Sequence, residues 1–365
     1  MKQEDFDEYI RQVEPSAQQS AADWQTAIGL QQVDGLKPSQ YLLEVAQRNI
    51  EGDITIDEVR QLLDSYYRSK VGRTSDIDDT AECDKAAANI KKILSTNTFA
   101  FNTNGFVATH RRIFEGVFKH AGELRTFDIT KKEWVLKGDT VNYLNWEDLR
   151  RAIDYDLQQE REFSYRGLTE AEKVRHICRF VSGLWQIHPF REGNTRTTAV
   201  FTIQYLRSMR YAVTNDMFRT HSWYFRNALV RANYKNARLG IDYDFTFLER
   251  FFRNLLLDER NELKNRSMLI NAPEGWETAP ISSSEQILRQ SVALSERQRR
   301  IVGMIHNEQI NEQINEQINS STLAVWLGIS EITARRELNA LREMGIIKRV
   351  GSKKTGHWEV IEGKG

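Results

Sequence analysis

The apolar residues of this sequence recur at every third or fourth position over most of its length, which is the spacing of one face of an α-helix. Near the N-terminus, Leu42, Leu43, Ala46 and Ile50 form such a face. Ser39 stands where a helix N-cap is expected, since its hydroxyl can accept a hydrogen bond from a first-turn N–H group. The pattern therefore predicts a short amphipathic helix after Ser39.

A capping box marks the next helix. Thr55 and Glu58 have its three-residue spacing, and Val59 begins the apolar face. Residues 1–70 are thus predicted to form two or three short helices, which bury little core alone and pack on the segment that follows. Residues 72–79 are polar and are predicted to be a linker.

Residues 80–270 are predicted to be predominantly helical. Apolar residues at helical spacing occur in residues 146–157, 170–185, 197–209 and 223–236. One stretch differs, because residues 133–143 contain two short β-favouring runs around Lys137, Gly138 and Asp139. We predict a β-hairpin there.

The third segment, residues 295–365, ends in a different pattern. Residues 321–329 and 331–344 are typical of two short helices joined by a tight turn. Residues 346–350 and 356–360 are candidate strands. The expected fold class of the whole chain is therefore mainly α-helical.

Charge and composition exclude several partners. The 51 Lys and Arg residues balance the 51 Asp and Glu residues, so the whole molecule does not attract DNA or an anionic membrane. No stretch approaches the roughly 18 apolar residues of a membrane span, and the acidic N-terminus does not resemble a secretory signal. Cys83 and Cys178 fit neither a disulfide framework nor a zinc site. We expect a cytoplasmic protein without a membrane partner.

Residues 187–197 carry the chemistry. An apolar helix ends at a loop that holds His188, and a second apolar helix starts directly after the loop. Gly193 and Asn194 tolerate positive φ, so the backbone can turn its N–H groups into a concave site. The next helix adds first-turn N–H donors and a partial positive charge, which favour a phosphate group.

Each side chain of the loop has a chemical role. Arg196 can form charge-assisted hydrogen bonds to phosphate, and Glu192 can bind a hydrated Mg²⁺ ion. His188 can take a proton from an attacking hydroxyl. A histidine before proline is more often an ordinary loop residue, and an acidic residue before Gly-Asn is usually a turn residue. The combination of these groups within nine residues favours the functional interpretation.

This arrangement resembles the Fic family, whose core motif is His-x-Phe-x-(Asp/Glu)-Gly-Asn-Gly-Arg-x-x-Arg. The resemblance covers residues 87–257, and the matching residues are His188, Phe190, Glu192, Gly193, Asn194 and Arg196. The stretch from Gly122 to Arg125 is similar to the family's Gly-x-x-Arg sequence. The resemblance implies a helical Fic core over residues 80–270.

The resemblance also implies an activity. Fic proteins are mostly adenylyltransferases, which move AMP from Mg-ATP onto a Ser, Thr or Tyr hydroxyl of a protein target. His188 would be the general base and Glu192 the Mg²⁺ ligand. The implied phosphate- and nucleotide-binding residues are Arg191, Gly193, Asn194, Thr195 and Arg196. A homodimer is plausible for this family.

The predicted hairpin occupies the place of the family's target-docking flap. Its residues are Trp134, Val135, Leu136, Lys137 and Gly138. Such a flap would align an extended segment of the target protein by strand pairing.

Two positions depart from the family motif. Thr195 replaces its second glycine, and Ala199 replaces its final arginine, which in the family holds the ATP γ-phosphate. Loss of a buried charged contact costs on the order of 2 to 3 kcal/mol. We therefore expect weakened or altered donor use. A different nucleotide donor, a phosphorylated-metabolite donor and removal rather than addition of AMP stay open.

The N-terminal segment resembles the small antitoxin partner of Fic toxins, fused here as a helical lid. Asp34 and Gly35 stand where that partner has its inhibitory glutamate, whose expected arginine partner is replaced by Ala199. We hypothesise that both halves of the ion pair are lost, leaving a vestigial inhibitory motif. The alternative is that Asp34 is only a turn residue before Gly35.

The C-terminal segment resembles a winged helix-turn-helix domain. From Glu331 to the end, eight Lys and Arg residues face five Asp and Glu residues. Arg335 and Arg336 on the second helix and Lys353 on the wing are the expected DNA contacts. Winged helices also bind proteins, so DNA contact is one of two alternatives here.

The rival function is a DNA-binding transcriptional regulator whose Fic core senses nucleotide or serves as a scaffold. Ala199 favours this alternative, whereas the intact His188 and Glu192 argue against it.

Overall fold

A computed structural model describes most of the chain. The described residues are 1–69, 75–96, 98–213, 217–270, 298, 301–302, 304–305, 318–327, 331–343, 346–350 and 357–361. They form a mainly α-helical fold whose one β-sheet, in the described ranges, has two strands. No helix in these ranges is long and apolar enough to cross a membrane.

The chain divides into two compact units. The first comprises residues 1–69 and 80–273, and the second comprises residues 70–79 and 274–365.

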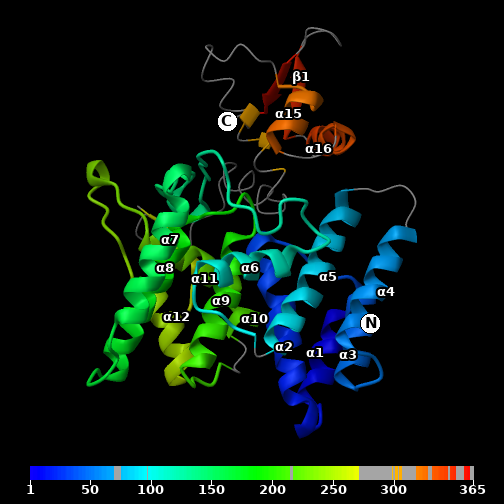
Figure 1. The fold of residues 1–365 in the computed structure, drawn as a ribbon. Helices are drawn as coiled ribbons and strands as arrows, with labels where there is room; N and C mark the ends of the chain where they lie inside the picture. Colours follow the sequence, from blue (N-terminus) through cyan, green and yellow to red (C-terminus); the bar gives the residue numbers. More distant parts are fainter. Residues whose placement is uncertain are drawn as a thin grey trace. The chain divides into compact units, whose positions relative to one another are not determined.

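Twelve of the described α-helices precede residue 270 (Figure 1). They are α1 Gln3–Arg11, α2 Gln18–Gly29, α3 Gln40–Ile50, α4 Ile56–Ser69, α5 Ser75–Leu94, α6 Thr103–Phe114, α7 Leu149–Glu162, α8 Glu170–Ile187, α9 Asn194–Ser208, α10 Met217–Thr220, α11 Ser222–Ala232 and α12 Thr246–Leu257. The 3₁₀ turns are η1 Pro15–Ala17, η2 Leu30–Asp34, η3 Trp134–Leu136, η4 Trp146–Asp148, η5 Ala237–Leu239 and η6 Asn265–Met268.

The two helices predicted after Ser39 and Thr55 are confirmed with their caps, but the described part of this segment holds four α-helices rather than the two or three predicted. The Ser39 hydroxyl accepts a hydrogen bond of 2.9 Å from the Leu42 N–H group at the start of α3. The Thr55 and Glu58 side chains form the reciprocal capping box before α4, with bonds of 3.2 and 2.7 Å. The linker prediction is wrong for residues 75–79, because these residues already belong to α5.

The N-terminal helices are firmly built into the first unit. Asp84 of α5 is fully buried and accepts hydrogen bonds from the Ser39 backbone N–H group at 2.9 Å and from the Tyr67 hydroxyl at 2.6 Å. Gly29 at the end of α2 lies so close to α10 that an added Cβ would stand 2.3 Å from the Arg219 Cα atom. In Figure 1 these helices gather beside α5. The segment therefore packs on the residues that follow it, as predicted from its small size.

Residues 133–143 do not form the predicted β-hairpin. Residues 134–136 form the 3₁₀ turn η3, and the rest of the stretch has no strand. Val135 and Leu136 are both buried, at 0% and 1% exposure, although successive strand residues face opposite sides. Lys137 ends the turn in the left-handed conformation, with φ of 53°. Burial of two adjacent side chains has overridden the β-favouring composition.

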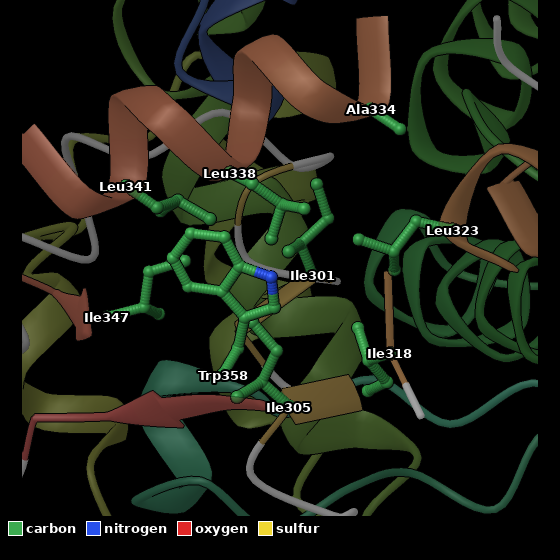
Figure 2. Packing of buried hydrophobic residues seen from close by; sticks show 9 residues of the cluster. All are labelled: Ile301, Ile305, Ile318, Leu323, Ala334, Leu338, Leu341, Ile347 and Trp358. Atoms are coloured by element: carbon green, nitrogen blue, oxygen red, sulfur yellow. The ribbon is translucent and has the colours of Figure 1, made fainter. Parts of the chain in front are cut away.

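The second unit contains the predicted C-terminal elements. Helices α15 Ser320–Leu327 and α16 Glu331–Glu343 precede strands β1 Ile347–Val350 and β2 His357–Val360. The strands are antiparallel, and Arg349 pairs with Trp358. Figure 2 shows Trp358 packed among Leu338, Leu341 and Ile347, in one apolar cluster. The predicted glycine turns and Lys353 lie outside the described residues.

Candidate active site

His188 occupies the junction between α8 and the following loop. Helix α8 ends at Ile187, and His188 takes the left-handed conformation with φ of 48°, which is uncommon for a non-glycine residue. Its side chain is 2% exposed and packs between the rings of Tyr143 and Trp185, with centroid distances of 4.2 and 5.1 Å. Nδ1 lies 3.3 Å from the Trp185 carbonyl oxygen. A bond there places the ring proton on Nδ1 and makes Nε2 the basic atom.

The loop closes on itself through Asn194. The Asn194 side-chain oxygen accepts a hydrogen bond of 2.9 Å from the Phe190 N–H group, and its nitrogen donates one of 2.7 Å to the Phe190 carbonyl. Gly193 has φ of 70°, and an added Cβ would stand 2.2 Å from the Phe114 ring. Asn194 therefore shapes the turn with both of its amide groups, and Gly193 satisfies a steric as well as a conformational demand.

Arg125 holds the backbone on the inner side of the loop. It is 1% exposed, its Nε donates to the His188 carbonyl at 2.9 Å, and its own N–H group donates to the Pro189 carbonyl at 2.9 Å. The guanidinium also donates to the carbonyls of Phe127 and Leu144. Burial lowers the pKa of Arg125 from its ordinary value, but an arginine stays charged at any physiological pH.

His110 holds the loop at a second point. Its Nε2 lies 3.1 Å from the Glu192 carbonyl oxygen, and its Nδ1 accepts a bond of 2.8 Å from the Gly122 N–H group. The imidazole stacks on the Phe190 ring with a centroid distance of 3.8 Å and an angle of 11°. Burial lowers the pKa of His110 to about 3. No spacing pattern indicates this role, since His110 and Glu192 are 82 residues apart.

Arg196 is enclosed by polar side chains from other parts of the first unit. The residue is 1% exposed. Its Nε lies 2.8 Å from an Asp34 carboxylate oxygen, and its terminal nitrogens donate to Glu82 at 2.7 Å and to Gln31 at 2.9 Å. The guanidinium also lies over the Phe114 ring, 4.7 Å from the centroid. Asp34 therefore contacts Arg196, the motif's first arginine, rather than position 199.

The remaining predicted phosphate-binding residues lie in different surroundings. Thr195 is 6% exposed, and its hydroxyl accepts a bond of 3.0 Å from the Trp185 indole N–H group. Arg191 is half-buried with its guanidinium 5.6 Å from the Phe127 ring centroid, and in the described ranges its Nε has no hydrogen-bond partner. Ala199 is fully buried.

The loop offers a single carboxylate to a metal ion. Glu192 is half-buried, and the described residues contain no group of three or more His, Cys, Asp or Glu side chains able to hold an ion. Mg²⁺ usually keeps several waters and binds through one or two carboxylates together with substrate phosphates. The donor set thus fits an Mg²⁺ ion that arrives with a nucleotide.

The stretch predicted to form the hairpin, residues 133–143, contacts His188 through Tyr143. Glu133 accepts a bond of 3.2 Å from the Tyr143 hydroxyl and pairs with Arg226 at 2.7 Å, while Tyr143 packs on the His188 ring. The Val135 carbonyl accepts a bond of 3.0 Å from the Ile270 N–H group. This backbone acceptor is occupied within the unit, and without a strand the segment offers less backbone for strand pairing.

Comparisons with known proteins agree on the family of this region. Residues 100–206 match the model of the Fic/DOC family. The chain is 26% identical over 196 residues to the protein adenylyltransferase VbhT of Bartonella schoenbuchensis, covering 53% of this chain and 39% of that protein. It is 26% identical over 118 residues to the probable protein adenylyltransferase Fic of Salmonella typhimurium, covering 32% of this chain and 55% of that protein. The chain thus spans about two fifths to just over half of these relatives.

A solved structure is similar at lower identity. It is a Fic family protein from Desulfovibrio desulfuricans G20, with a TM-score of 0.37 and 15% identity over 93% of this chain and 88% of that one.

Proposed function

Since residues 100–206 carry a Fic/DOC domain, we propose that this protein transfers AMP from Mg-ATP onto a Ser, Thr or Tyr hydroxyl of a protein target. The observation that carries the proposal is the state of His188: a buried imidazole whose Nδ1 faces a backbone carbonyl, leaving Nε2 as the base. It lies directly before the anion-binding turn at the N-terminus of α9.

The residues support a one-step transfer. The target hydroxyl oxygen attacks the α-phosphorus, an O–P bond forms, and the bond to the bridging oxygen breaks. Pyrophosphate leaves with the electrons of that bond, and His188 Nε2 takes the hydroxyl proton. The first-turn N–H groups of α9 stabilise the negative charge that develops on the phosphoryl oxygens. When bound, Mg²⁺ would neutralise polyphosphate charge, and Glu192 is the residue to hold it.

We propose that two arginines bind the phosphates of the nucleotide, and their surroundings differ. Arg196 is occupied by Asp34, Glu82 and Gln31, so it can grip phosphate only after these contacts open. Arg191 carries no ion pair among those found in the described ranges, and we propose that it supplies the phosphate contact that Ala199 lacks.

We further propose that Asp34 and Glu82 restrain the site. Two carboxylates and an amide saturate a guanidinium that phosphate would otherwise bind. Asp34 has thus kept an arginine partner, although a different one from the partner that the family motif implies. Asp34 also ends the 3₁₀ turn η2, and Gly35 follows it with φ of 71°. The residue therefore belongs to a turn and contacts Arg196 at the same time.

The first experiment is label transfer from ATP labelled on the α-phosphate, with Mg²⁺ and cell lysate. We expect wild-type protein to label a protein band and His188→Ala to reduce labelling by roughly 10² to 10⁴. The control is His176→Ala, which removes a half-buried histidine that contacts Glu160 at 2.6 Å. Equal labelling by wild type and His188→Ala would refute the proposal.

The restraint is tested with point variants rather than by removing the N-terminal helices, because Asp84 and Gly29 tie these helices to the unit. Asp34→Asn and Glu82→Gln keep the side-chain shapes and remove charge. We expect each to raise labelling about 10-fold, the change that 1.4 kcal/mol produces. Unchanged or lower labelling with normal stability would show that these carboxylates only support the fold.

We propose a winged helix-turn-helix domain for the C-terminal unit. The order of α15, α16 and the two antiparallel strands supports it. Arg335 is exposed on α16, which favours contact with a phosphate backbone. Retention of the full chain on duplex DNA at low salt, reduced by Arg335→Glu, is the expected result. No retention would favour the protein-binding alternative.

A further inference from the structure

The Glu192–Gly193 peptide lies at the centre of the proposed phosphate-binding turn, and His110 contacts it from the inner side. His110 comes from α6 and is fully buried. Its Nε2 lies 3.1 Å from the Glu192 carbonyl oxygen. Because a peptide unit is planar and trans, a carbonyl that faces His110 directs the Gly193 N–H group to the opposite side.

The two ring nitrogens of His110 have different partners, and these fix its tautomer. The Gly122 N–H group donates to Nδ1 at 2.8 Å, so Nδ1 carries the lone pair. The ring proton is then on Nε2, where it can donate to the Glu192 carbonyl. Stacking on Phe190 at 3.8 Å fixes the plane of the ring. Two hydrogen bonds and one stacked face leave the imidazole a single orientation.

We infer that His110 is a positioning residue of this site: it orients the Glu192–Gly193 peptide so that the Gly193 N–H group faces the phosphate. The inference rests on the proposed function, since it assigns the turn a phosphate ligand. Filling space in the core would require only a ring of this size and no hydrogen bonds. Here both polar atoms of the ring bind backbone, one in the turn and one in the segment that leads to Arg125.

Other backbone carbonyls of the turn are also bound by residues of the protein interior. Arg125 binds the carbonyls of His188 and Pro189, and Asn194 binds the carbonyl of Phe190. The backbone carbonyls of the turn are therefore directed to the interior at several successive residues. His110 is the member of this set whose contact lies next to Gly193, the residue with positive φ. Pro189 has no N–H group, and the Phe190 N–H group donates to Asn194. The anion-binding concavity therefore relies on the N–H groups opposite the Phe190 and Glu192 carbonyls, those of Arg191 and Gly193.

The test compares two histidines that each stack on a phenylalanine, His110, which is fully buried, and His176, which is half-buried. His110→Phe keeps the stacked ring and removes both hydrogen bonds. His176→Phe is the matched control, because His176 also stacks on a phenylalanine, Phe163, at 3.4 Å and has one polar partner. We expect His110→Phe to weaken ADP binding about 10-fold, with and without Mg²⁺, and His176→Phe to leave it unchanged. Calorimetry gives the affinities, and thermal unfolding shows whether each variant is folded.

A folded His110→Phe variant with wild-type ADP affinity would overturn the inference. His110→Gln, whose amide can still donate to the Glu192 carbonyl, should recover part of the affinity. If His110→Phe does not fold, nitrogen NMR on the wild type decides. We expect His110 to carry its proton on Nε2, and the Gly193 amide signal to shift on addition of ADP. A proton on Nδ1, or an unshifted Gly193 amide, would contradict the inference.

The two proposals fail differently. Wild-type protein that binds neither ADP nor pyrophosphate refutes the nucleotide site and the proposed function with it. Wild-type binding that is insensitive to His110→Phe refutes only the positioning role.

Discussion

Two sets of contacts surround the turn that follows His188, and we call the contacts to its backbone carbonyls the inner side and the contacts of the Arg196 guanidinium the outer side. On the inner side, Arg125, His110 and Asn194 bind backbone carbonyls. On the outer side, the Arg196 guanidinium is bound by Asp34 and Glu82. Under the proposed function, a phosphate would compete for the guanidinium and not for the carbonyls. The inner contacts would then keep the shape of the site, whereas a ligand would have to displace the outer contacts.

The largest expected effect comes from the inner side. Arg125→Ala removes a buried cation that donates to several carbonyls and leaves them without partners. We expect a loss of about 3 to 5 kcal/mol in the free energy of unfolding, together with loss of ADP binding. Chemical denaturation measures the first and calorimetry the second. A loss below 1 kcal/mol would show that the inner contacts are not structural.

Gly193→Ala tests the turn itself. The alanine would adopt φ near 70° and place its Cβ 2.2 Å from the Phe114 ring. We expect a loss of about 2 to 3 kcal/mol, from backbone strain and overpacking together. Gly167→Ala is the matched control, since Gly167 has φ of 81° and open space around it. Equal losses in the two variants would mean that the ring contact contributes nothing.

Gly29→Ala loosens the outer side without touching a charge. The added Cβ would meet the backbone of Arg219 and Phe218, and η2, which carries Asp34, begins directly after Gly29. We expect a loss of about 1 to 3 kcal/mol and a rise in AMP transfer as Arg196 is released. Gly183→Ala controls for a helical glycine, because its nearest neighbour is only a side-chain oxygen at 3.3 Å. A stability loss without any change in activity would separate docking of η2 from restraint of Arg196.

The smallest expected effect is at Asp156, which takes part in neither the inner nor the outer contacts. Burial raises the pKa of Asp156 in α7 to about 6, from an ordinary value of 3.8. The folded state then binds a proton more tightly, so the stability that Asp156 contributes is present below pH 3.8 and lost as the pH rises to about 6. Asp156→Asn should therefore stabilise the protein at pH 7 by about 1 kcal/mol, allowing for partial solvent screening.

Denaturation at pH 7 and at pH 3.5 checks this. The gain should disappear at the lower pH, whereas a gain of equal size at both values would rule out the proton linkage.

Local chemistry made several features predictable. Ser39, Thr55 and Glu58 cap their helices as expected, because a cap depends only on residues three apart. The C-terminal helices and strands also lie close to their predicted bounds, because hydrophobic spacing is likewise a local signal. The candidate site was also visible in the sequence, since His188, Glu192 and Gly193 lie within one short loop.

The β-hairpin at residues 133–143 shows where local signals fail. Its β-favouring residues bury two adjacent side chains, Val135 and Leu136, whereas a two-stranded hairpin with one face in solvent buries only alternate side chains. The free energy gained by burying these two side chains exceeds the differences in strand propensity between residues, which span only about 1 kcal/mol.

The sequence by itself determined the helical elements, their caps and the composition of the loop after His188. Only the tertiary structure decided what surrounds that loop. Arg196 lies 165 residues from Gln31 and 114 residues from Glu82, and no periodicity or spacing links positions so far apart. The partners of His110 were hidden for the same reason. Hydrogen bonds and ion pairs of this kind form because packing brings distant groups together, and that packing depends on the whole chain.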